Sequence, residues 1–230
     1  MDSVILDRLP FHVEVESLLK KLHIRPGSGN EREFRHLVEL AEAVARPKVS
    51  YKLAFIEAKE EEAVVIDGIR FTSRVLRVNL DAINRVFAFV GTSGVELGAW
   101  ADAQEEILAQ FWADAINQAV LGAAMDGFRA HLTAQFAVPP LMTMNPGSLA
   151  DWPLGQQRPL FELLGAAPRA IGVELLPSLL MTPTKTISGI FFPSAETFAS
   201  CQLCPREACP NRRAEYDPEL FQRKYADLKQ

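Results

Sequence analysis

Residues 178–193 read SLLMTPTKTISGIFFP and lie in the part of the chain, Met144–Arg213, around which the rest is organised. This part opens with MNPGSLADWP, continues through QQRPLFELLG, and closes on CQLCPREACPNRR. Pro139 and Pro140 break the helical pattern that precedes it. We therefore expect both the fold and the functional site to depend on this part of the chain.

Cys201, Cys204 and Cys209 are the only cysteines and have the spacing C-x2-C-x4-C. Pro205 and Pro210 each directly follow a cysteine, and prolines stiffen a loop so that its thiolates converge, as in bacterial iron–sulfur loops. We predict that the three thiolates hold an iron–sulfur cluster. Zinc would want a fourth protein ligand, and the odd count argues against a disulfide framework. Reduced or regulatory thiols are a further alternative.

Composition limits the class of protein. The chain has 230 residues, of which 48% are hydrophobic and 23% charged, as in ordinary globular proteins. Its net charge of -5 is spread along the chain, which argues against a nucleic-acid partner. Its apolar runs fall short of the roughly 20 residues of a membrane span, and the N-terminus does not resemble a signal peptide. The expectation is a cytoplasmic protein with no membrane partner.

The pattern upstream of residue 144 mixes strands with helices. We expect two short strands in 2–14, a hairpin in 50–71 turning at Asp67-Gly68, and a strand at 85–92. Helical periodicity predicts a helix from Glu31 to Pro47 and the longest helix from Ala99 to about Thr133. A final helix is predicted in the charged tail, 212–230.

Residues 144–192 resemble the C-terminal half of the reactivation domain of cobalamin-dependent methionine synthase. The matching pieces are Pro146-Gly147, the run LFELL at 160–164, SLLMTP at 178–183 and TISGIFF at 186–192. Upstream, the strand and long helix at 85–128 resemble those of the same family, so the likeness covers roughly residues 70–195. The chain thus resembles a stand-alone version of this domain with an added three-cysteine loop.

The resemblance implies an α+β fold in which helices bracket a twisted antiparallel sheet. In that family the domain binds S-adenosylmethionine beside the corrinoid, while cob(II)alamin takes an electron from a flavoprotein and a methyl group from the bound cofactor. It implies a cofactor site at these positions of the chain: Pro146, Gly147, Ser148, Asp151, Lys185, Ser188 and Gly189. Turn or helix-capping roles explain Asp151, Lys185 and Ser188 equally well.

The sequence departs from the family in its site motif and in its cysteine loop, and the family's early acidic residue before a Trp-Thr-Pro segment has no visible counterpart near the N-terminus. At the position of the family motif Arg-Pro-x-Pro-Gly-Tyr, this sequence has Thr143 in place of the arginine and Ser148 in place of the tyrosine. Without that guanidinium, the carboxylate of S-adenosylmethionine loses a bidentate partner. The cysteine loop is absent from the fused methionine synthase pattern, and we assign residues 1–195 to the family-like domain and 196–230 to the loop and a final helix.

Three hypotheses follow for the function. In the first, the chain supports reductive reactivation of a corrinoid methyltransferase, with Cys201, Cys204 and Cys209 holding a cluster that supplies the electron. In the second, it is a non-catalytic module that docks a corrinoid protein and uses the cysteines for a structural metal. In the third, it is an S-adenosylmethionine-binding activator with altered ligands. Cobalamin belongs to the partner in all three, and no catalytic residue is assigned to this chain.

Overall fold

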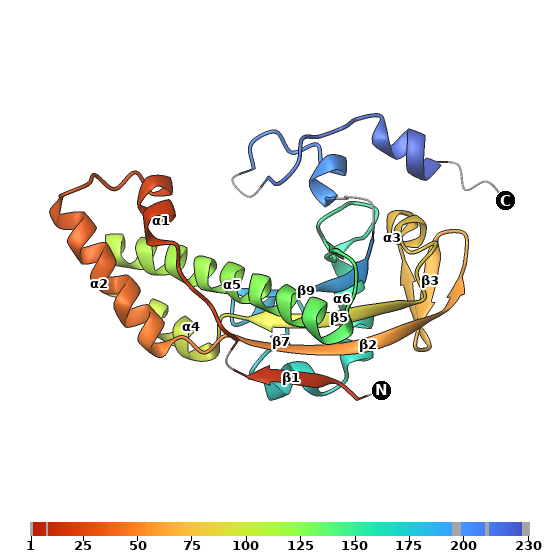
Figure 1. The fold of residues 1–230 in the computed structure, drawn as a ribbon, viewed down its shortest axis with the longest axis horizontal. Helices are drawn as coiled ribbons and strands as arrows, with labels where there is room; N and C mark the ends of the chain where they lie inside the picture. Colours follow the sequence, from red (N-terminus) through yellow and green to blue (C-terminus); the bar gives the residue numbers. More distant parts are fainter. Residues whose placement is uncertain (1, 8, 195–198, 210–211, 227–230) are drawn as a thin grey trace.

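The computed structural model describes residues 2–7, 9–194, 199–209 and 212–226. Within this part of the chain, one antiparallel sheet has the strand order β4-β3-β2-β5-β9-β6, and β1 pairs with β2 (Figure 1). The strands of this sheet are β1 (Val4–Asp7), β2 (Lys48–Lys59), β3 (Ala63–Ile66), β4 (Ile69–Thr72), β5 (Arg85–Thr92), β6 (Leu141–Met144) and β9 (Thr186–Pro193). A separate pair consists of β7 (Glu174–Leu175) and β8 (Met181–Thr182).

Helices cover both faces of this sheet. They are α1 (Val15–Lys21), α2 (Gly29–Val44), α3 (Arg74–Asn79), α4 (Val95–Asp102), α5 (Ile107–Phe136), α6 (Gln157–Leu164) and α7 (Ala167–Ala170). Short 3-10 turns occupy η1 (Leu154–Gln156) and η2 (Ser200–Leu203), and a π-helical turn forms η3 (Phe221–Ala226). The predicted fold class, α+β with an antiparallel sheet between helices, is confirmed.

Strand β5 lies at the centre of the sheet between β2 and β9. All but the first of its residues are buried, which explains why RVFAFVGT is apolar without alternation. Its aromatic residues fix the register with β9, because Phe87 lies opposite Phe191 and Phe89 lies opposite Gly189. Backbone hydrogen bonds and aromatic side chains therefore both hold β5 against β9.

Helix α5 packs on one face of the β5–β9 pair. The ring of Phe128 lies 5.7 Å from the rings of both Phe89 and Phe191, and these two rings stack at 4.7 Å. The opposite face is covered by α3, α6, α7 and the C-terminal segment, whose Tyr225 is fully buried in the same cluster as Trp152. The N-terminal part of α5 packs with α2 and α4 in a separate cluster, where the Trp112 ring meets the Phe34 ring edge-on.

Several predicted elements agree with the structure. Helix α2 corresponds to the predicted helix beginning near Glu31, and the Ser28 hydroxyl caps it by accepting the Glu31 N–H at 3.2 Å. The hairpin turning at Asp67-Gly68 is formed by β3 and β4, and the strand 85–92 is β5. No described helix is long and apolar enough to cross a bilayer.

Two predicted elements were wrong. The single helix from Ala99 to Thr133 is two helices, because the side chain of Gln104 donates to Trp100 O at 2.9 Å and Gln110 donates to Gln104 O at 2.7 Å, which satisfies the carbonyls at the break. The second N-terminal strand is not formed in the described residues 9–14, and the chain then enters α1 at Val15. The final helix predicted in the tail is present as η3 (Phe221–Ala226), which is π-helical, and residues 227–230 lie outside the described part. The predicted domain boundary lies among residues 195–198, outside the described residues.

A glycine in β9 allows the edge strand β6 to approach. A Cβ on Gly189 would lie 2.5 Å from Met144 O and 2.6 Å from the side-chain nitrogen of Asn145. We therefore expect Gly189→Ala to lower the free energy of unfolding by about 1–3 kcal/mol, measured by urea titration. Gly122→Ala in α5 is the matched control, because open space surrounds Gly122 and alanine favours the helix. Equal stability of the two variants would contradict this packing.

Candidate functional site

A pocket of about 460 Å³ lies between α5, strands β6 and β9, and the C-terminal segment. Its apolar walls come from Phe89, Leu121, Met125, Ile187 and Phe191. Its polar lining comprises Gln118, Asp126, Arg129, Thr143, Asn145, Arg212 and Arg213. Three arginines and a single acidic residue give this space, which we call the arginine pocket, a positive balance.

Arg129 is placed by the packing of α5 on the sheet. It follows Phe128, and its guanidinium carbon lies 5.0 Å from the centre of the Phe191 ring, a cation–π distance. One nitrogen donates to Leu141 O at 2.6 Å. Burial lowers the pKa of Arg129, the charge of Asp126 opposes that shift and the charge of Arg213 adds to it. The guanidinium stays charged at neutral pH, so it can bind an anion.

Strand alternation in β6 directs Thr143 to the same face as Leu141, toward α5. The Thr143 hydroxyl is buried and has no hydrogen-bond partner among the described residues. Beside it, the side-chain amide of Asn145 donates to Ser188 O at 2.8 Å and thereby ties the end of β6 to β9. A buried hydroxyl without a partner is uncommon, and here it borders the arginine pocket.

The C-terminal segment is held in place by the Arg212 side chain. Its guanidinium donates to Cys201 O at 3.1 Å, to Cys204 O at 3.2 Å and to Ala214 O at 3.2 Å, and also to Arg206 O. These acceptors occupy its donors, so Arg212 is a structural clamp. Arg213 is exposed and borders the pocket, which leaves its side chain available to a ligand.

A second pocket, of about 340 Å³, lies on the other side of the turn that follows β6. It brings Gly147 and Ser148 together with Cys204 and Pro205, and we call it the turn pocket. The turn itself is tight, because Ser148 N donates to Asn145 O at 3.1 Å and Gly147, with φ of +84°, donates to Trp152 O at 2.8 Å. The cysteine loop and the family-like turn are therefore neighbours in space.

Comparison with known proteins bears on the fold. No protein-family model and no curated protein matches the sequence. Among solved structures, the MetH reactivation domain bound to AdoHcy is similar, with a TM-score of 0.61 and 15% identity over 87% of this chain and 81% of that chain. The chain has the fold of that reactivation domain. The resemblance drawn from residues 144–192 is confirmed at the level of fold.

Within this reactivation-domain fold, none of the seven predicted cofactor residues lines the arginine pocket. Gly147 and Ser148 line the turn pocket. Pro146, which precedes them in the same turn, is buried. Ser188 is buried, and its hydroxyl has no hydrogen-bond partner in the described part of the chain; Gly189 lies against the end of β6.

The two charged residues of the predicted set have protein partners. The Asp151 carboxylate caps α3 by accepting the Val75 N–H at 2.9 Å, the Arg74 N–H at 3.3 Å and the Ser73 hydroxyl. Lys185 forms an ion pair with Asp114 at 2.7 Å. These contacts commit both side chains to the fold.

Sequence reasoning missed Arg129 and Asn145. A signal for Arg129 was available, since it is the one arginine or lysine in the thirty residues of α5. Its role could not be read from helical periodicity, because the residues that complete the pocket come from β6, β9 and the C-terminal segment.

The three cysteines are free thiols and are partly buried. Among the described residues, which include all three, no group of three or more histidine, cysteine, aspartate or glutamate side chains is arranged to hold a metal ion. A cluster needs converging thiolates. As placed here, Cys201, Cys204 and Cys209 do not fit the predicted iron–sulfur site.

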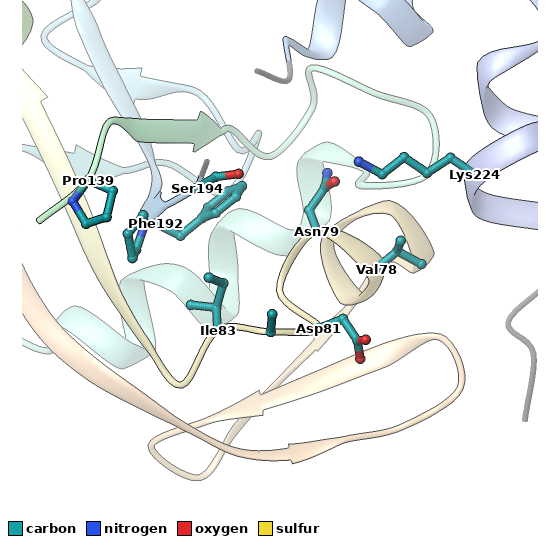
Figure 2. Close-up of a pocket in the computed structure, with 10 residues that line it drawn as sticks. Val78, Asn79, Asp81, Ile83, Pro139, Phe192, Ser194 and Lys224 are labelled. Carbon is teal, nitrogen blue, oxygen red and sulfur yellow. The ribbon is translucent and has the colours of Figure 1, made fainter. Parts of the chain in front are cut away.

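A further pocket, of about 550 Å³, lies where α3, the start of β6 and the end of β9 meet η3 (Figure 2). Figure 2 shows the Lys224 side chain pointing toward Asn79. The Asn79 amide is already engaged, because it accepts from the Tyr225 hydroxyl at 3.0 Å and donates to Met144 Sδ. Asp81 is paired with Arg77 at 2.7 Å. Of these polar groups, Asn79 anchors the C-terminal segment through Tyr225.

The thiol of Cys201 has a pKa below the ordinary value of a cysteine thiol. Burial opposes ionisation, but the N–H groups of Arg213 and Ala214 and the charges of Arg213 and Arg212 together lower the pKa of Cys201. Because a lowered pKa keeps the thiolate present at lower pH, we expect iodoacetamide to alkylate Cys201 with a pH midpoint below that of the same residue in guanidinium-unfolded chain. Peptide mass spectrometry at a series of pH values measures this.

Arg213→Gln should move that midpoint upward, since it removes one of the two positive charges near the thiol. Identical midpoints in folded and unfolded chain would contradict the arrangement around Cys201.

Proposed function

We propose that this chain is an accessory protein that supports reductive reactivation of a cobalamin-dependent methyltransferase. The observation that carries the proposal is the fold shared with the MetH reactivation domain over 87% of this chain. The partner is a corrinoid protein, and the chain's own part is to dock that partner and to position a small ligand beside it.

Reactivation in that family consumes one electron and one methyl group per corrinoid. Cob(II)alamin accepts the electron to become cob(I)alamin, which displaces the methyl group of S-adenosylmethionine and leaves S-adenosylhomocysteine. In the narrower hypothesis, a cluster on Cys201, Cys204 and Cys209 supplies this electron. Since the thiols as placed do not converge, we assign the electron to a separate reductant.

A specific observation also favours the S-adenosylmethionine-binding hypothesis. Thr143 occupies the position of the family's arginine, yet the pocket that Thr143 borders contains Arg129 and Arg213 from other elements. Either guanidinium can pair with a ligand carboxylate, and the pocket volume of about 460 Å³ suits a small molecule. The turn formed by Pro146, Gly147 and Ser148 is proposed as the adjoining wall. We propose Ser188 and Gly189 as supporting residues beneath it.

The activity test is a reconstituted reactivation assay. A cobalamin-dependent methionine synthase without its own reactivation domain, held as cob(II)alamin, is mixed with S-adenosylmethionine, a titanium(III) reductant and the full chain. We expect the methylcobalamin absorption band to return at least about tenfold faster with the chain than without it, as expected if docking and positioning lower the barrier. The proposal fails if the chain accelerates the reactivation of neither this methionine synthase nor any corrinoid methyltransferase from the chain's own organism.

Ligand binding can be tested without a partner. We expect calorimetry to detect binding of S-adenosylhomocysteine to the full chain, and Arg213→Gln to weaken it about tenfold, the effect of one charged hydrogen bond. Arg129→Leu should weaken it at least as much, with circular dichroism to verify folding. Arg70→Gln is the matched control, because Arg70 lies on β4 at the opposite end of the sheet and pairs with Glu60.

Absence of binding to the unmodified chain would overturn the altered-ligand hypothesis while leaving corrinoid docking open to the first assay. Binding that survives both arginine substitutions would move the ligand out of the arginine pocket.

A further inference from the structure

Two of the three cysteines share a single helical turn. Cys201 lies in η2, and Cys204 follows η2 directly, with its N–H donating to Cys201 O at 3.2 Å. In such a 3-10 turn, side chains three residues apart are eclipsed, and a rise of about 2 Å per residue separates their Cα atoms by roughly 6 Å. Disulfide-bonded cysteines have Cα separations of about 4.4–6.8 Å. The backbone therefore places this pair at a bonding separation.

The turn that carries both thiols is held from outside. The Arg212 guanidinium donates to the carbonyl oxygens of both Cys201 and Cys204, so one side chain joins the two ends of the turn. Gln202 adds two contacts. Its side-chain oxygen accepts the Ala199 N–H at 3.0 Å, and its main-chain carbonyl accepts the Asp217 N–H at 2.9 Å. Holding the turn in this way reduces the conformational entropy that ring closure would otherwise cost.

Cys209 differs from this pair. It lies five residues beyond Cys204, past Pro205, and it is outside the hydrogen-bonded turn. All three thiols are partly exposed, so small reagents can reach each of them. The described residues contain no three-ligand metal group, whereas two eclipsed thiols suffice for a dithiol.

We propose that Cys201 and Cys204 form a reversible dithiol–disulfide pair, with Cys209 outside it. The oxidant is a small disulfide such as glutathione disulfide. The Cys201 thiolate attacks one of its sulfurs and releases one glutathione thiolate, and the Cys204 thiolate then attacks Cys201 Sγ and releases the second. Two electrons pass from the protein to the oxidant, and the two thiol protons go to the released glutathione thiolates.

Oxidation of the Cys201–Cys204 pair would take place next to the candidate site. Cys204 borders the turn pocket beside Gly147 and Ser148, and the Arg212 clamp joins the same turn to the wall of the arginine pocket. A disulfide would close covalently the ring that Arg212 now closes by hydrogen bonds. The proposal concerns a modification site and holds whichever ligand or partner the site accepts.

The experiment equilibrates the full chain with defined ratios of reduced and oxidised glutathione under argon, then blocks free thiols with N-ethylmaleimide. Trypsin is expected to cut after Lys185, Arg206 and Arg212, so Cys201 and Cys204 share the peptide 186–206 while Cys209 falls in 207–212. We expect the first peptide to lose both labels together as the buffer becomes oxidising, with a mass two hydrogens below the dithiol. The second peptide should keep its label.

Three variants sharpen the result. Cys209→Ser should leave the transition unchanged, whereas Cys204→Ser should convert the first peptide to a glutathione adduct on Cys201. Arg212→Leu should shift the equilibrium with glutathione about tenfold toward the dithiol, the effect of losing a charged hydrogen bond. Arg70→Leu is the matched control, because Arg70 lies on β4, pairs with Glu60 and makes none of the carbonyl contacts that close the turn.

The proposal is overturned if no Cys201–Cys204 disulfide forms across the whole buffer series, or if oxidation links either residue to Cys209. It is also overturned if anaerobically purified chain retains iron and sulfide with all three thiols protected from N-ethylmaleimide, which would establish the cluster instead. None of these outcomes depends on corrinoid reactivation, so failure here is distinct from failure of the proposed function.

Discussion

The contact between Phe128 of α5 and the stacked rings of Phe89 and Phe191 determines the arrangement of the site. It fixes the long helix over the β5–β9 pair, which is the centre of the sheet. Because Arg129 follows Phe128, the same packing sets the guanidinium over Phe191 and within reach of Leu141 O. A hydrophobic contact thus orients the half-buried charge on which the candidate site depends.

The C-terminal segment completes this site. Tyr225 is buried and donates to Asn79, which attaches the end of the described chain to α3. Arg212 organises the cysteine turn through backbone carbonyls. With both ends tied, the segment contributes Arg213 to one pocket and Cys204 to the other. An addition that resembles a separate appendage in sequence is therefore part of the walls of both pockets.

Elements with a strong local signal were predictable. Helix α2 combines an apolar stripe with a serine cap, and β5 is a continuous apolar run, so periodicity and composition identify each of them. The division between α4 and α5 was not, because it depends on side-chain amides of Gln104 and Gln110 that satisfy carbonyls in three dimensions. Asp151 was equally ambiguous: a carboxylate can bind a ligand or cap a helix, and only its distance to α3 distinguishes the two.

The sequence by itself was enough to predict the class of fold, through the family resemblance that SLLMTP and TISGIFF carry within residues 178–192. It also identified the cysteines as the chemically distinctive residues. Only the tertiary structure decided which groups meet. Arg129, Thr143 and Arg213 are far apart in sequence and border one pocket, while Cys201 and Cys204 share a turn that Cys209 does not. The physical reason is that a pocket is made by packing between elements, and local sequence patterns report on each element separately.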